Sequence, residues 1–280
     1  MPQVANFVPS DLEVPGGPGL LGWNGYQRHF LAEGDSWFTL AALPGGNLLQ
    51  ELHLDRWAMV VNTAYPGDKL SNIVEWRDNQ EFVRLLAVPG FAYQWDAILL
   101  SAGGNDLIAA AGTRGGLLKQ PAADPMVLEN WINRASLQKF LDYVKANMAC
   151  IVDLRDSADS PNKGIPIYAH TYDYPTARPA PAKFMGTLDF SGPWLYDAYV
   201  GIGLPEQLWV PMTEFLIDAL AETLLGMNLA NVHVIDTRGV MARAAEGSTG
   251  DSGDWLNEIH ANRNGRKKLA HRWNDVLNQV

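Results

Sequence analysis

The sequence predicts an α/β fold, a doubly wound three-layer α/β/α sandwich that forms one domain over residues 1–280. Short, continuously apolar runs alternate with longer segments of helical periodicity. Hydrophobic residues make up 47% of the 280 residues, which is enough for one large core. No internal repeat, low-complexity tract or long linker divides the chain. These three observations favour βαβ units around a single sheet.

Five short runs are expected as strands of this sheet. Each is β-branched or continuously apolar, which is typical of parallel strands buried on both faces. Because strands that alternate with helices form βαβ units, the sheet should be five-stranded and mostly parallel. The runs are His29–Ala32, Trp57–Val61, Ala97–Leu100, Ile165–Ala169 and Val232–Ile235.

Four segments have the pattern of helices. In the second of them, the apolar residues from Leu137 to Val144 follow i, i+3, i+4, i+7 spacing, which gives one apolar stripe. The four expected helices cover Lys69–Leu86, Asn130–Asp156, Pro205–Leu225 and Arg263–Leu277.

Two segments depart from the alternation. Residues 1–25 are rich in proline and glycine and are expected to be an irregular lead-in. Residues 172–211 carry six prolines and eight aromatic residues and directly follow the fourth strand. Since ligands of open α/β sheets bind beyond the carboxyl ends of the strands, this aromatic insertion is placed to wall or cover a site. Packing over a sheet edge is the alternative.

Composition excludes several classes of partner. The net charge of −10 and the pI near 5.0 disfavour nucleic acid as partner or substrate. No run approaches the ~20 apolar residues of a membrane span. The single cysteine, Cys150, allows no intrachain disulfide and no paired-cysteine zinc site, and no histidine–carboxylate motif for a metal is present. The N-terminus lacks the charged and apolar regions of a secretory signal, which favours a cytoplasmic protein.

Turns that follow strands carry the residues of a serine hydrolase. Ser36 follows the first strand, Gly67 the second and Asn105 the third, so parallel strands bring all three to one edge of the sheet. His260 lies near the C-terminus and supplies a base for the hydroxyl of Ser36. The N–H groups of Ser36 and Gly67 and the side-chain amide of Asn105 are the predicted donors to an oxyanion. Asp35 and Asp106 are expected to form hydrogen bonds to the turns around the site rather than to react.

These segments resemble the four sequence blocks of the SGNH (GDSL) hydrolases. Gly34-Asp35-Ser36 matches the nucleophile block, Gly67 the glycine block, Gly103-Gly104-Asn105-Asp106 the GxND block and His260 the histidine block. The resemblance implies a flavodoxin-like sandwich and hydrolysis of carboxylic esters through an acyl-enzyme, with no metal and no cofactor. The GxSxG motif of the other large hydrolase fold is absent.

The sequence departs from this family at the position that orients the histidine. The family places an aspartate three residues before its histidine, whereas this chain has Asn257. An amide carries no charge to stabilise an imidazolium, so Asp254 is predicted as the orienting acid. Glu258 and a backbone carbonyl are the alternatives. Ala261 stands where a proline often follows the histidine.

The predicted function is therefore a serine ester hydrolase of the esterase or lipase type, acting on a small-molecule ester. A carbohydrate acetylesterase is one alternative, since ten tryptophans suit sugar stacking. A non-catalytic ligand-binding protein on the same scaffold is the other, favoured by Asn257. His170, at the end of a strand, competes with His260 as the base, although a structural role suits it better.

Overall fold

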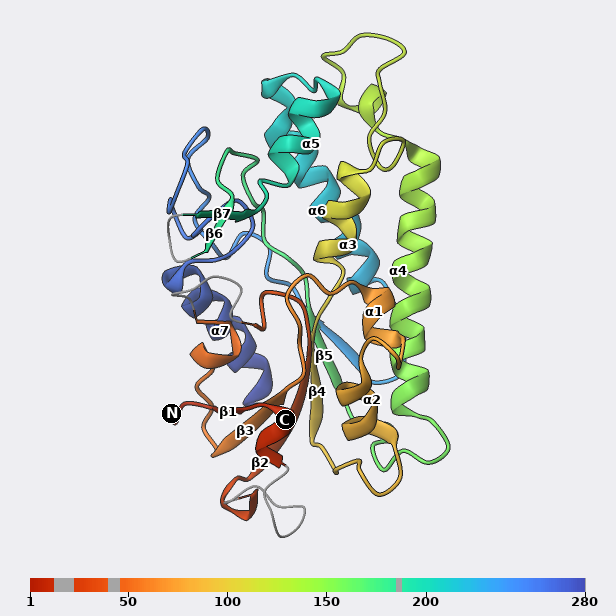
Figure 1. Ribbon diagram of the computed structural model, residues 1–280, viewed down its shortest axis with the longest axis vertical. Helices are drawn as coiled ribbons and strands as arrows, with labels where there is room; N and C mark the ends of the chain where they lie inside the picture. Colours follow the sequence, from red (N-terminus) through yellow and green to blue (C-terminus); the bar gives the residue numbers. More distant parts are fainter. Residues whose placement is uncertain (13–22, 40–45, 185–187, 280) are drawn as a thin grey trace.

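The computed structural model describes residues 1–12, 23–39, 46–184 and 188–279 (Figure 1). Part of the predicted lead-in, 13–22, and residues 185–187 of the predicted insertion lie outside the described residues. The described part forms one six-stranded sheet flanked by helices and a separate two-stranded hairpin.

All five predicted strands are present, and every pairing in their sheet is parallel. The sheet has a sixth strand, β1, over Ala5–Phe7 in the segment predicted to be irregular; three residues are too few to show a period. The strand order is β1-β3-β2-β4-β5-β8. The other bounds are β2 Arg28–Gly34, β3 Ala58–Asn62, β4 Ala97–Ser101, β5 Ile167–His170 and β8 Val232–Ile235.

The order of the strands creates a switch point at β2. From β2 the chain moves outward to β3 on one side, and then crosses to β4 on the other side. Leaving β1 aside, the order is that of the flavodoxin-like fold, in which ligands bind where the order reverses. The turn that follows β2 at Gly34 therefore occupies the expected place of a site.

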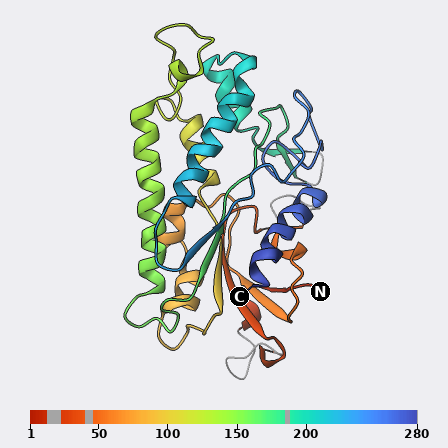
Figure 2. The same cartoon turned by 180° about the vertical axis from the view of Figure 1, so that it is seen from behind.

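Helices cover both faces of the sheet (Figures 1 and 2). Helix α7 packs on one face, and α1, α2, α4 and α6 cover the other. Helices α3 and α5 lie beyond the carboxyl ends of the strands, where α3 packs on α5. The bounds are α1 Leu70–Val74, α2 Gln80–Ala87, α3 Gly104–Gly112, α4 Arg134–Arg155, α5 Leu195–Ile202, α6 Trp209–Leu225 and α7 Arg263–Leu277.

The predicted helix Lys69–Leu86 is two helices in the structure. Between α1 and α2, the carbonyl of Glu75 accepts hydrogen bonds from the N–H groups of both Asp78 and Asn79, at 3.0 Å each. Asp and Asn favour turns and helix starts over helix interiors, which explains why the chain turns here and begins again at Gln80.

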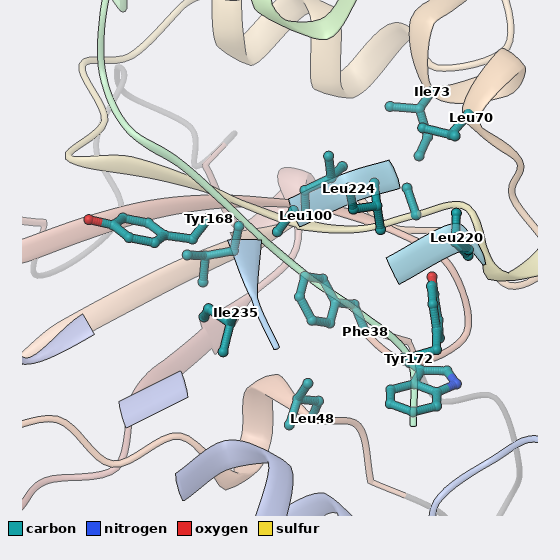
Figure 3. Packing of buried hydrophobic residues seen from close by; sticks show 14 of the residues in the cluster. Phe38, Leu48, Leu70, Ile73, Leu100, Tyr168, Tyr172, Leu220, Leu224 and Ile235 are labelled. Atoms are coloured by element: carbon teal, nitrogen blue, oxygen red, sulfur yellow. The ribbon is translucent and has the colours of Figure 1, made fainter. Parts of the chain in front are cut away.

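The core lies on both sides of the central strands. Every residue of β4 is buried, and Leu31 and Ala32 of β2 are fully buried. Figure 3 shows side chains from β4, β5 and α6 packing together, with Tyr172 at the edge of this cluster. Burial on both faces explains the apolar sequences of these strands.

The predicted aromatic insertion contains structure of its own. It holds the antiparallel hairpin of β6, Ala182–Phe184, and β7, Leu188–Ser191, followed by α5. Its core contacts include Tyr199, which is fully buried. The insertion therefore contributes packing, as well as residues that border the site described next.

Candidate active site

The turn after β2 presents Ser36 at the carboxyl edge of the sheet. Gly34 ends the strand with φ +149° and lies in register with Ser101 of β4. A Cβ at Gly34 would lie 2.2 Å from the carbonyl oxygen of Ser101, so only glycine fits. The N–H of Asp35 donates to that same carbonyl at 2.9 Å. This close approach of the two strands fixes the position of the backbone that leads into Ser36.

Ser36 and His260 meet in the structure. The Oγ of Ser36 lies 2.8 Å from Nε2 of His260, although 224 positions separate them in the sequence. Ser36 is half-buried and His260 is 9% exposed. The predicted nucleophile and the predicted base are therefore within hydrogen-bond distance.

Asn257 holds the other nitrogen of His260. Its Oδ1 lies 3.0 Å from Nδ1 of His260 and also accepts the N–H groups of Ile259 and His260, at 3.1 and 2.9 Å. Because two backbone N–H groups point at this atom, it must be the amide oxygen, which only accepts. Nδ1 of His260 therefore carries the proton, and Nε2 is free to accept the hydroxyl proton of Ser36.

The prediction that Asp254 orients His260 is wrong. The carboxylate of Asp254 accepts from the Nζ of Lys268 at 2.6 Å, from the N–H of Ala242 at 2.5 Å, and from Asn264. Although burial raises it, these hydrogen bonds keep the pKa of Asp254 below its usual value. Asp254 ties the histidine loop to α7 and has no hydrogen bond to the imidazole.

We therefore expect Asp254→Asn to affect stability and leave catalysis intact. The change removes a buried charge partner of Lys268 and should lower the free energy of unfolding by about 1–3 kcal/mol. Thermal melting and kcat per folded molecule measure the two effects separately. A loss of kcat by more than tenfold at unchanged stability would contradict this assignment.

Glu258, the reserve candidate, also has a different role. Its carboxylate accepts backbone N–H groups at the start of α5, from Leu195 at 3.1 Å, Tyr196 at 2.7 Å and Trp194. Burial raises the pKa of Glu258 to about 7, against the opposing effect of these donors. A carboxylate at a helix N-terminus is stabilising, so Glu258 fixes α5 to the histidine loop.

Trp37 joins the two halves of the site, a role that the sequence did not reveal. Its indole Nε1 donates to the carbonyl of Ile259 at 3.2 Å, so the residue after Ser36 bonds to the residue before His260. Trp37 is 9% exposed and packs edge-on against Trp255. The signal for this role in the sequence was the position of Trp37 directly after Ser36, the predicted nucleophile.

Asn105 lies beside Ser36, and both border the same cavity. One N–H of the Asn105 amide donates to the carbonyl of Asp68 at 3.0 Å, which leaves its second N–H for another acceptor. Asn105 does not cap α3, because the residue before α3 is Gly103 and no side chain caps that helix.

Gly67 belongs to the loop that Asn105 contacts. It has φ +88°, which favours glycine, and it precedes Asp68. Within the described ranges, the N–H groups of Gly67 and Ser36 have no hydrogen-bond acceptor. Gly67 does not border the cavity, so its contribution to an oxyanion site stays a prediction.

Asp106 and Asp35 form hydrogen bonds around these turns, as the sequence predicts for both. Asp106 accepts the N–H of Leu70 at the start of α1 and the hydroxyl of Tyr143 at 2.6 Å. Asp35 accepts the N–H of Trp37 at 3.0 Å. Burial raises the pKa of both carboxyls, that of Asp35 to about 6.

A second serine–histidine pair lies behind the first. Ser101 Oγ is 2.9 Å from Nε2 of His170 and 2.8 Å from a carboxylate oxygen of Asp35. The serine stands between the other two groups, whereas the histidine does so in a catalytic triad. Nδ1 of His170 instead faces the carbonyl of Thr171 at 2.7 Å.

This second network is sealed inside the protein. Ser101 is 0% exposed and His170 1%, and neither borders the cavity beside Ser36. Ser101 ends β4 and His170 ends β5, so the network joins three neighbouring strands through Asp35. Its geometry is that of a structural support beneath the turn that carries Ser36, and His170 contacts Ser101 while His260 contacts Ser36.

The electrostatics of the imidazole follow from burial. Burial alone lowers the pKa of His260 to about 4, because desolvation disfavours the imidazolium and no charged group offsets it. The imidazole is therefore neutral at neutral pH, as a general base must be.

A metal or a membrane helix finds no support among the described residues. They contain no group of three histidine, cysteine or carboxylate side chains arranged to hold a metal ion. None of the helices within 1–12, 23–39, 46–184 and 188–279 is long and apolar enough to span a bilayer.

We compared the chain with known proteins, and the matches are to solved structures of similar architecture. No family profile and no curated protein matches the sequence. A possible lipase from Chitinophaga pinensis superposes with a TM-score of 0.50 at 10% identity, over 90% of this chain and 98% of that one. For an extracellular lipase from Streptomyces rimosus the TM-score is 0.47, with 16% identity over 90% and 99% of the two chains. For a phospholipase A1 from Streptomyces albidoflavus these values are 0.47 and 13%, over 90% and 98%.

At identities this low, the likeness concerns the fold alone. The shared architecture agrees with two features of the structure: the strand order around β2, and the turn at the switch point that requires glycine at position 34. The chain therefore has the flavodoxin-like three-layer α/β/α fold that its resemblance to the SGNH (GDSL) hydrolases implied.

Proposed function

We propose that this protein is a serine ester hydrolase in which Ser36 is the nucleophile and His260 the general base. The observation that carries the proposal is the 2.8 Å contact between Ser36 Oγ and Nε2 of His260, in the tautomer set by Asn257. Ser36 also borders a cavity, which the buried Ser101 does not.

The proposed reaction runs in two steps through an acyl-enzyme. Nε2 of His260 takes the hydroxyl proton as Ser36 Oγ attacks the ester carbonyl carbon. The oxyanion then accepts the free N–H of the Asn105 amide and the N–H groups of Ser36 and Gly67. The imidazolium returns its proton to the leaving alcohol, and a water molecule releases the acid by the same route. No metal or cofactor takes part in this proposal.

Asn257 can orient the imidazole of His260 although it carries no charge. Its oxygen cannot rotate away from Nδ1 without losing two backbone donors. The usual defect of an amide at this position is that its NH₂ group faces the imidazole and imposes the wrong tautomer. The backbone of Ile259 and His260 prevents that arrangement here.

Labelling with a fluorophosphonate probe tests the proposal directly. The probe reacts only with an activated serine, so we expect one adduct on the intact protein, located on Ser36 by peptide mass spectrometry. Purified protein should also hydrolyse p-nitrophenyl acetate. Absence of both label and hydrolysis would leave a ligand-binding protein on the same scaffold. An adduct on Ser101 would transfer the nucleophile role to the second pair.

The pH profile gives an independent check. Because the base must be neutral and burial lowers the pKa of His260 to about 4, kcat/KM should rise with pH through about 4 and be level above about pH 6. The sign follows from protonation, since acid converts His260 to the inactive imidazolium. An acid limb centred near 6.5, the value of an exposed histidine, would contradict this environment.

Acetyl groups on a polysaccharide are the second candidate substrate. The half-buried Trp194 lies edge-on to His260, with 5.6 Å between ring centroids. An indole at this place suits contact with a sugar that leaves as the alcohol. Release of acetate from acetylated xylan, compared with p-nitrophenyl acetate, would separate this candidate from a small-ester hydrolase.

A further inference from the structure

We propose that the cavity beside Ser36 holds the acyl group of the substrate and admits only short acyl chains. The inference rests on the proposed ester hydrolysis at Ser36 and concerns what that site accepts. Its basis is the chemistry of the cavity wall, the position of the cavity relative to His260, and its size.

The wall of the cavity is apolar and comes from three helices beyond the strand ends. Its aliphatic side chains are Leu107 and Ile108 of α3, Leu195 of α5, and Leu216 and Ile217 of α6. Such a wall favours a hydrocarbon over a sugar or a charged group.

Apart from Ser36 and Asn105, the polar side chains on the wall are already engaged. The hydroxyl of Thr213 lies 3.0 Å from that of Tyr199. The carboxylate of Asp173 accepts the backbone N–H groups of Gly239 and Met241, at 2.7 and 2.6 Å. Asp35 is bonded to Ser101 and Trp37. The cavity therefore offers a ligand few free polar partners.

The position of the cavity assigns it to the acyl side of the ester. The leaving oxygen has to face Nε2 of His260, from which it takes a proton, and the carbonyl oxygen has to face Asn105. Ser36 and Asn105 border the cavity, whereas His260 does not. The group that extends into the cavity is therefore the one bonded to the carbonyl carbon. The alcohol lies on the side of His260 and Trp194.

The size of the cavity limits the chain. Its volume is about 30 Å³. By the same measure one water molecule needs roughly 10–15 Å³, so the cavity has room for about two waters, or an acyl group of about two to four carbons. A longer chain would have to displace Leu216 or Leu195, which are 1% and 2% exposed and packed in the core, or else extend out of the open side of the cavity and away from its apolar wall.

A series of p-nitrophenyl esters from acetate to decanoate tests this size limit. With the alcohol held constant, kcat/KM should be highest from acetate to butyrate and at least about tenfold lower from octanoate onward. A level profile, or a maximum at octanoate or decanoate, would overturn the inference. Because the acetate would still be hydrolysed, the proposed function would stand in that case.

Two variants test the location of the acyl group. Leu216→Ala enlarges the cavity and should raise kcat/KM for hexanoate relative to acetate by about tenfold or more, since each methylene buried contributes about fourfold. Ile108→Ala, at a half-buried position of α3, should act in the same direction with less risk to folding. Leu224→Ala is the matched control, because Leu224 is 1% exposed on the same helix as Leu216 but does not border the cavity.

The control and the alcohol series complete the test. Leu224→Ala should leave the ratio of hexanoate to acetate unchanged. Acetates of small and large alcohols should keep their ranking in Ile108→Ala. If Ile108→Ala and Leu216→Ala change the alcohol ranking and leave the acyl ranking as it was, the cavity holds the alcohol and the inference is wrong. If the wild-type protein hydrolyses no ester and Ser36 takes no label, the proposed function itself fails.

Discussion

Ser36→Ala is expected to lower kcat for p-nitrophenyl acetate by about 10⁴-fold or more, because removing the nucleophile of a serine hydrolase leaves only binding and oxyanion stabilisation. The fold should survive the change, since Ser36 is half-buried and its hydroxyl bonds only to His260 among the described residues. Thermal melting and circular dichroism should therefore match the wild-type protein.

The matched comparison is Ser101→Ala. Ser101 has a histidine and a carboxylate within hydrogen-bond distance, just as a nucleophile would. Because it is fully buried, we expect kcat within about tenfold of wild type and a loss of about 1–3 kcal/mol in the free energy of unfolding. Hydrolysis that persists in Ser36→Ala and disappears in folded Ser101→Ala would reverse the two assignments.

The second large effect concerns Asn257. Asn257→Leu removes the acceptor that fixes the tautomer of His260, so we expect kcat to fall by about 10²–10⁴-fold. The same change leaves the N–H groups of Ile259 and His260 without their acceptor, so a melting curve has to accompany the rate. Activity close to wild type in a folded Asn257→Leu would show that His260 needs no orienting side chain.

Asn257→Asp separates charge from orientation. A carboxylate can accept the same three donors, so the loop should keep its shape. Its charge stabilises the imidazolium, which should move the acid limb of kcat/KM from about pH 4 upward by about one to three pH units. Rates above the new limb should equal or exceed those of the wild type. An unmoved acid limb would mean that the introduced carboxyl is uncharged or does not face His260.

The hydrogen bonds of the histidine loop explain why the sequence predicts the wrong orienting residue for His260. Charge by itself favours Asp254, because the amide of Asn257 has no charge with which to stabilise an imidazolium. Local geometry decided otherwise, because a side-chain oxygen readily accepts N–H groups two and three residues further along the chain. Those bonds turn Asn257 toward His260, while Asp254 is drawn to Lys268 on α7.

The sequence by itself determined the parallel sheet and pointed to the candidate site residues. Continuous apolar runs located five strands, because strands buried on both faces have no polar side to show. The candidate residues were recognised by position: Ser36 and Asn105 follow strands, and His260 lies near the C-terminus. The short strand β1 and the break between α1 and α2 were not predicted, since they depend on a few residues and on local turns.

Tertiary structure alone decided which of the two serines, Ser36 or Ser101, borders a cavity and which side chain faces Nδ1 of His260. Each depends on contacts between segments far apart in the sequence, such as Trp37 with Ile259, and α3 and α6 beside Ser36. A periodic pattern reports which face of an element is buried, but not which distant side chain it meets. Ser36 and Ser101 cannot be distinguished as residue types. The packing around them differs, because Ser36 borders a cavity whereas Ser101 is fully enclosed.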